Sequence, residues 1–218
     1  MSIEARCGSD LRDFVLEKLY SSRRVTIISP WISRETANIL LDLSSRGVEV
    51  HLITTSDPQP YHIRGLGLLI SAERRVVKPG KPRLVKTGLV LSIIGFLLIP
   101  LMPPVGAVLV ATGLLMVFKY RTIYTEHYYP RIRELLVTSS KLHAKLILTD
   151  SALGIGSMNF TESGLLTNIE CFAWITDPQV REQVIRDVNT ITSTLRKNAV
   201  DYKSIYSMIK HVEKHRKK

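Results

Sequence analysis

The chain has 218 residues, of which 45% are hydrophobic, with 12 glycines and 10 prolines; this composition excludes disordered and fibrous classes and suffices for a folded core. Its 30 Lys and Arg residues outnumber 19 Asp and Glu residues, and the net charge of +11 favours anionic partners such as nucleic acid, acidic lipids or phosphate-bearing substrates. Two cysteines, Cys7 and Cys171, are too few for a disulfide framework or a closed zinc site and favour a reducing compartment.

The first 80 residues predict alternating helices and strands. Ser9 and Asp10 are typical helix-capping residues, and Ser33 is expected to open a second helix that Gly47 ends in a left-handed C-cap. The residues up to Arg6 lack the apolar stretch of a signal peptide, so membrane contact is expected from within the chain. The expected elements are a helix over 10–21, a strand over 25–29, a helix over 37–45, a strand over 48–54 and a helix over 61–75.

A long apolar run follows these elements. Residues 87–118 form a run of 32 residues without a charged side chain. As a single helix the run would extend about 48 Å, well beyond a hydrocarbon core of about 30 Å. Pro100, Pro103 and Pro104 lie near its middle and should divide it, because proline removes a backbone donor and clashes with the preceding helical turn.

The divided run predicts a membrane helical hairpin with arms over 84–102 and 103–124. Each arm is close to the length of about 20 residues that crosses a bilayer. Basic residues flank both ends, which places both ends in the cytoplasm. Two alternatives stay open: a hairpin buried in a large soluble core, and a shallow re-entrant loop. Small residues would let the arms approach closely: Gly88, Ser92, Gly95, Gly106, Ala107, Ala111 and Gly113.

The chain beyond the run predicts more strands, a long helix and a basic tail. We expect an α/β fold with a mixed, largely parallel sheet flanked by helices, built from both sides of the hairpin. The later strands are expected over 134–139, 141–149, 152–156 and 170–175, and the helix from 177 to about 198. The expected organisation is 1–83 and 125–200 as two parts of one domain, 84–124 as the hairpin and 201–218 as the basic tail.

Candidate catalytic residues lie in the second part of this domain. On one predicted strand, His143 and Lys145 share a face, and a cation beside an imidazole suggests an anionic substrate. Ser157 and Asn159 follow the next strand, where hydroxyl and amide groups can bind phosphate oxygens. Glu170 is expected to accept the second ring proton of His143 and to fix the tautomer of that ring.

Together these residues resemble the signature of the phospholipase D superfamily. The pattern His-x-Lys-x4-Asp, Gly-Ser-x-Asn and Asn-x-Glu is matched by His143, Lys145, Asp150, Gly156, Ser157, Asn159, Asn168 and Glu170. Five residues separate Asp150 from Gly156, where six is the more familiar spacing, and the difference falls in a connection between strands. The resemblance does not cover the apolar run.

The resemblance implies a two-step displacement at a phosphodiester through a covalent phosphohistidine. Lys145 and Asn159 would bind the non-bridging oxygens, and Glu170 would orient the imidazole. No metal or cofactor is implied. The implied catalytic residues are His143, Lys145, Ser157, Asn159 and Glu170, with Asp150 and Gly156 as structural support of the motif.

The chain carries a single copy of the motif, whereas the mechanism needs two histidines. A symmetric homodimer that brings two His143 side chains together is the simplest solution, and the chain is similar in this respect to the small bacterial nuclease type. The sequence therefore predicts a membrane-anchored phosphodiesterase with its catalytic domain in the cytoplasm and nucleic acid as the leading substrate. Two alternatives are a phospholipid hydrolase or phosphatidyltransferase, and a catalytically inactive membrane tether that binds nucleic acid or a partner.

Overall fold

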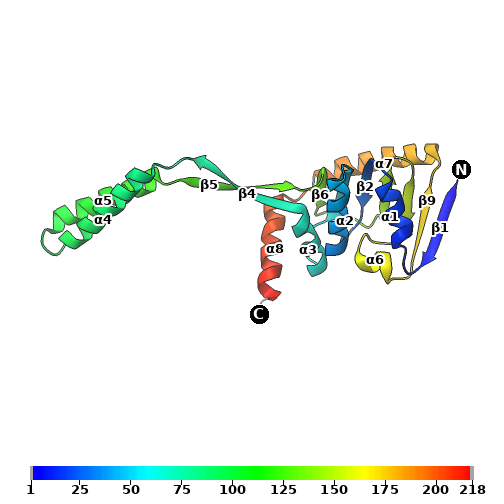
Figure 1. Cartoon of the computed structure of the whole chain (residues 1–218), viewed down its shortest axis with the longest axis horizontal. Helices are drawn as coiled ribbons and strands as arrows, with labels where there is room; N and C mark the ends of the chain where they lie inside the picture. Colours follow the sequence, from blue (N-terminus) through cyan, green and yellow to red (C-terminus); the bar gives the residue numbers. More distant parts are fainter. Residues whose placement is uncertain (1, 217–218) are drawn as a thin grey trace. The chain divides into compact units, whose positions relative to one another are not determined.

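The computed structural model describes residues 2–216, with side chains described as far as Lys214. The chain forms two compact units (Figure 1). The first comprises the described residues up to Ser71 and from Tyr128 onward, and the second comprises Ala72–His127. The first unit therefore draws on both sides of the apolar run.

Seven strands of the described residues form one sheet in the first unit. Strands β2, β3 and β6 pair in parallel, and the other neighbouring strands pair antiparallel. The mixed α/β class is confirmed, whereas the expectation of largely parallel pairing was wrong: a short turn joins β7 to β8 and allows only antiparallel pairing, and β9 and β1 also pair antiparallel with their neighbours. In sheet order the strands are β1 (Ile3–Gly8), β9 (Glu170–Ile175), β8 (Leu153–Gly156), β7 (Leu146–Thr149), β2 (Arg24–Ile28), β3 (Glu49–Thr55) and β6 (Glu134–Thr138).

Helices cover both faces of this sheet (Figure 1). One face packs in a core with α1, α2, α3, α6 and α8, and the other packs against α7 through Val188 and Leu195. Alternate strand residues serve the two cores: Ile27 and Leu52 face the first, and Ile28 and Ile53 face the second. The helices are α1 (Arg12–Tyr20), α2 (Arg34–Ser45), α3 (Pro60–Leu69), α6 (Glu162–Leu166), α7 (Pro178–Arg196) and α8 (Tyr202–Arg216).

The observed helix ends agree with some of the predicted caps and not with others. Ser33 caps α2 as expected, because its hydroxyl accepts from the Thr36 N–H while the Thr36 hydroxyl accepts from the Ser33 N–H. Gly47 lies just beyond this helix with a φ of +86°, the left-handed conformation that glycine adopts without strain. The predicted cap of α1 was wrong, because its N-cap is Leu11 and no side chain caps it. Helix α3 ends earlier than expected, at Leu69.

Strand β1 was not predicted, and it brings the two cysteines together. Cys7 in β1 lies opposite Cys171 in β9, with 4.1 Å between their Cα atoms, and the two form a disulfide. They are 164 residues apart in the sequence, so only the pairing of two strands could reveal the contact. This bond runs against the expectation of reduced cysteines.

The second unit contains a helical hairpin and a two-stranded ribbon. The ribbon is formed by β4 (Ile70–Lys78) and β5 (Ile123–Pro130), and the hairpin by α4 (Pro82–Leu98) and α5 (Pro103–Tyr120). The helices are shorter than the predicted arms, because the chain enters β5 soon after α5 ends.

Glycines allow the two helices to pack closely. A Cβ atom on Gly113 would lie 2.3 Å from the carbonyl oxygen of Gly88, and one on Gly95 would lie 2.7 Å from that of Gly106. The outward side chains are apolar and exposed: Leu97, for example, is 68% exposed. Within the described residues, α5 is the helix that is long and apolar enough to cross a membrane, by length and composition. Insertion of the hairpin into a membrane stays a prediction.

Candidate active site

The candidate residues gather at one edge of the seven-stranded sheet. The strand pairing sets this edge, because Ile28 at the end of β2 lies opposite Leu146 at the start of β7, and Leu146 lies opposite Ile155 near the end of β8. Gly156 then lies opposite Phe172 near the start of β9. At this edge the chain leaves β2, β3, β6 and β8 and enters β7 and β9. The connecting segments therefore meet at one place, where loops can build a site on a rigid scaffold.

His143 and Lys145 are in contact at this edge. The Lys145 Nζ atom lies 3.4 Å from His143 Nε2 and donates to the His143 carbonyl oxygen at 2.9 Å. The strand predicted over 141–149 begins only at Leu146, so the two side chains meet through an irregular segment and not through strand alternation. Burial lowers the pKa of the Lys145 ammonium, an effect that the nearby Glu170 carboxylate partly opposes.

Glu170 makes different contacts from those expected. In the described part of the chain its carboxylate accepts hydrogen bonds from the hydroxyl of Ser157 and from Nδ2 of Asn168, at 3.3 Å for the latter, and not from His143. The physical reason is the pairing of β8 with β9, which places the residue after β8 beside the first residue of β9. Ser157 also accepts from the Cys171 N–H at 3.1 Å, so its hydroxyl is fixed at both ends.

Asn159 lies in the turn after β8, which is bound to the end of β2. The Phe160 N–H donates to the Ser29 hydroxyl at 2.9 Å, and the Thr36 hydroxyl donates to the Phe160 carbonyl at 2.8 Å. The Asn159 Oδ1 atom is buried and has no hydrogen-bond partner among the described residues. Buried amides normally have partners, so this group retains hydrogen-bonding capacity inside the site.

Asp150 and Gly156 lie where they affect the backbone. The Asp150 carboxylate accepts from the backbone N–H groups of Arg23 and Arg24, which ties the end of β7 to the start of β2, at the edge of the sheet remote from His143. At Gly156, a Cβ atom would lie 2.2 Å from the Cys171 carbonyl oxygen, so no larger residue fits there without movement of the backbone. The role of both residues as structural support of the motif stays a prediction.

A cleft of about 510 Å³ opens beside His143. Its walls are the segments that follow β2, β3 and β6, and they include Trp31, Asp57 and Lys141. The sequence favoured core or interface packing for Trp31 and did not single out Asp57; the places of both residues just after the ends of two neighbouring parallel strands were the available signal. Among the described residues, no group of three or more His, Cys, Asp or Glu side chains is arranged to hold a metal ion.

Comparison with known proteins identifies the family of the chain and its fold. The family described as "Cardiolipin synthase, PLD-like domain" matches residues 15–192, which is most of the chain. The chain belongs to the phospholipase D superfamily. A search of curated protein sequences finds no match.

Several solved structures resemble this chain at low sequence identity. Nuc from Salmonella typhimurium, a phospholipase D family member, aligns with a TM-score of 0.51 and 14% identity over 92% of this chain and 99% of Nuc. NucT from Helicobacter pylori has a TM-score of 0.44 and 13% identity, covering 92% of this chain and 100% of NucT. Phosphatidylserine synthase from Haemophilus influenzae has a TM-score of 0.45 and 14% identity, covering 91% of this chain and 39% of the synthase. The similarity to Nuc shows a shared fold.

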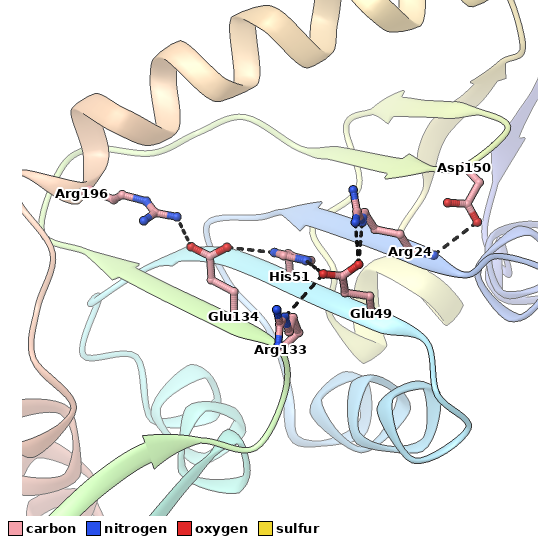
Figure 2. Close-up of polar contacts among 7 residues, drawn as sticks. All are labelled: Arg24, Glu49, His51, Arg133, Glu134, Asp150 and Arg196. Carbon is pink, nitrogen blue, oxygen red and sulfur yellow. Dashed lines mark hydrogen bonds and ion pairs between the residues drawn. The ribbon is translucent and has the colours of Figure 1, made fainter.

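The phospholipase D-like domain holds a second polar cluster at the opposite edge of the sheet (Figure 2). His51 lies between two carboxylates there, with Nδ1 2.9 Å from Glu134 Oε2 and Nε2 3.4 Å from Glu49 Oε1. Arg24 pairs with Glu49 at 2.7 Å, and Arg196 from α7 pairs with Glu134. Because these charges are paired with one another across β2, β3, β6 and α7, we interpret the cluster as structural.

Proposed function

We propose that the chain is a membrane-anchored phosphodiesterase that cleaves nucleic acid through a phosphohistidine. Members of the phospholipase D superfamily are phosphodiesterases or phosphotransferases. One observation carries the proposal: His143 and Lys145 are in contact at the same sheet edge as Asn159 and the Ser157–Glu170 pair. An imidazole nucleophile beside a cation and an amide, that of Asn159, whose Nδ2 atom can donate, is suited to attack on a phosphodiester.

The proposed reaction has two displacements. A ring nitrogen of His143 attacks phosphorus, a phosphorus–nitrogen bond forms, and the bond from phosphorus to the leaving oxygen breaks. A second histidine gives its proton to that oxygen and then takes a proton from water. The oxygen of that water attacks phosphorus and the phosphorus–nitrogen bond breaks, which regenerates His143. Lys145 and Asn159 stabilise the charge on the non-bridging oxygens in both steps.

We propose that the second histidine is His143 of another copy in a symmetric homodimer. The exposure of His143 at the rim of the cleft supports this, because a partner's imidazole has access to the same space. A composite site of this kind makes activity depend on both copies. When wild-type protein and the His143→Asn variant exchange subunits at equal amounts, about one quarter of the activity should remain; about one half would show independent sites.

Two observations bear on substrate and location. The net charge of +11 favours a polyanionic chain, whose cleavage should weaken steeply as salt concentration rises. The exposed apolar side chains of α4 and α5 support a membrane anchor, and the basic residues around it support cytoplasmic placement of the catalytic domain. The same hairpin favours the second candidate, a phospholipid substrate, whose turnover would depend on vesicle content and less on salt.

The test is to trap the covalent intermediate. Full-length protein in detergent is incubated separately with phosphorus-labelled DNA, RNA and mixed phospholipids, quenched in alkali and mapped for the labelled residue. We expect label at His143 from nucleic acid, and a fall in cleavage of at least about 10³-fold in His143→Asn. The matched control is His127→Asn, since His127 is exposed on β5 and does not line the cleft. Label from phospholipid alone, or unchanged cleavage by His143→Asn, would contradict the proposal.

A further inference from the structure

The cleft beside His143 has two chemically different sides. One side carries Lys141 and His143, and the Lys145 ammonium lies in contact with the His143 ring. The other is formed by Trp31, Asp57 and two prolines, Pro30 and Pro58. An anionic phosphate is attracted to the first side and repelled by the Asp57 carboxylate on the second. The uncharged part of a substrate is therefore expected to lie against Trp31.

Trp31 is held in a fixed orientation at this wall. Its indole N–H donates to Asp57 Oδ2 at 3.0 Å, and its carbonyl accepts from the Ser29 hydroxyl at 2.7 Å. The next residue, Ile32, donates its N–H to the fully buried His62 at 3.1 Å. Asp57 is fixed in turn, since its Oδ1 accepts from the Gln59 N–H at 3.2 Å. The single donor of the indole is already used, so the ring offers a ligand its aromatic surface.

The two tryptophans of the chain differ in what they contact. Trp174 is 0% exposed, donates to the Phe14 carbonyl at 3.0 Å and packs edge-on against Phe172 in the core. Trp31 is half-buried and borders the cleft. A large aromatic ring that is held rigid at the wall of a phosphate site, and is not consumed by core packing, is suited to stack on a planar base.

We propose that Trp31, oriented by Asp57, is a nucleobase-stacking residue that makes the site select unstacked, single-stranded nucleic acid. The proposal rests on the proposed function and names its substrate class. A base inside a duplex has both faces covered by its neighbours, so only an unpaired or splayed-out nucleotide can present a face to the indole. A fatty acyl chain gains no comparable stacking, which separates this substrate from a phospholipid.

Binding is measured with full-length protein in detergent, in a His143→Asn background that prevents turnover. The probes are a single-stranded 12-residue oligodeoxynucleotide, the same strand with abasic sites, its blunt duplex and vesicles of phosphatidylglycerol. We expect the oligonucleotide to quench tryptophan fluorescence, and the duplex, the abasic strand and the vesicles to leave it unchanged. Trp31→Leu should weaken oligonucleotide binding about 5- to 100-fold and leave binding of the abasic strand unaltered.

Two further variants serve as controls. Trp31→Phe keeps a stacking ring and should retain most of the affinity while losing the quench, so the test stands even if Trp31→Leu does not fold. Tyr61→Leu is the matched control, because Tyr61 is 43% exposed but lies outside this cleft, and it should bind as the parent does. Equal affinity of the parent and Trp31→Leu, or equal binding of normal and abasic strands, would overturn the inference. Cleavage of nucleic acid that needs His143 but not Trp31 would overturn the inference alone, whereas turnover of phospholipid alone would overturn the proposed function.

Discussion

The two units of the chain use apolar side chains in opposite ways. In the α/β unit, Leu52 is 0% exposed at the centre of the sheet, between helices that cover both faces. In the hairpin unit, Leu97 is 68% exposed, and glycines lie where the two helices approach each other closely. Residue type alone therefore does not define a core. Apolar side chains stabilise the first unit because they are buried, whereas in the second unit they remain available for contact with an apolar phase such as a membrane.

Replacement of the hairpin gives the largest expected effect. The Lys81 N–H donates to the Tyr120 carbonyl at 2.9 Å, so a short Gly-Ser turn can replace residues 82–120. We expect the protein to move from the membrane fraction to the aqueous fraction, because the exposed apolar surface is removed, and to keep the phosphodiesterase activity that we propose for it. Flotation with vesicles measures the first property and cleavage assays the second. Continued flotation of the shortened protein would show that another surface binds the membrane.

A matched pair of leucine truncations tests the contrast in burial. Leu52→Ala should lower the free energy of unfolding of the α/β unit by about 2–5 kcal/mol, because it leaves a cavity in a packed core. Leu97→Ala should change that free energy by less than about 0.5 kcal/mol. Urea unfolding in detergent, followed by the fluorescence of buried Trp174, measures both. Similar losses of unfolding free energy in the two variants would contradict the difference in burial between the units.

In both units glycines lie where backbone segments approach each other closely. Two glycine variants test this requirement in the α/β unit. Gly156→Ala should destabilise the α/β unit by about 1–3 kcal/mol, because the new Cβ atom would lie 2.2 Å from the Cys171 carbonyl. Gly67→Ala in α3 meets only Ile209 at 3.4 Å, and it should raise stability by about 0.5–1 kcal/mol through helix propensity. The same urea titration compares the two, and a stable Gly156→Ala variant would contradict the tight fit.

The smallest expected effect concerns pH and is confined to the α/β unit. Burial lowers the pKa of His62, whose Nδ1 accepts from the Ile32 N–H and whose Nε2 donates to the Thr55 carbonyl at 2.8 Å. Since the unfolded state binds this proton more tightly, stability is complete above the unfolded pKa of about 6.5 and falls as pH drops toward the folded value. His62→Gln should flatten that dependence relative to the parent, measured by urea midpoints from about pH 7.5 to about pH 5. If the urea midpoint of His62→Gln depends on pH as that of the parent does, other groups cause the pH dependence.

The features that could be predicted from the sequence are local ones. The spacing from His143 to Glu170 identified the superfamily, the Ser33 cap placed α2, and the uncharged run located the hairpin helices, because each depends on residues that are close in the chain. Periodicity also located most strands of the sheet to within a few residues.

The contacts between distant segments became visible only in the folded chain. The antiparallel direction of β7, β8 and β9, the disulfide of Cys7 with Cys171 and the Ser157–Glu170 pair all follow from strand order and register, which local pattern leaves free. The wall of Trp31 and Asp57 beside His143 arises in the same way, since three loops far apart in sequence end at one edge of the sheet. Local spacing fixes which groups are present, and the long-range pairing of strands fixes which of them meet.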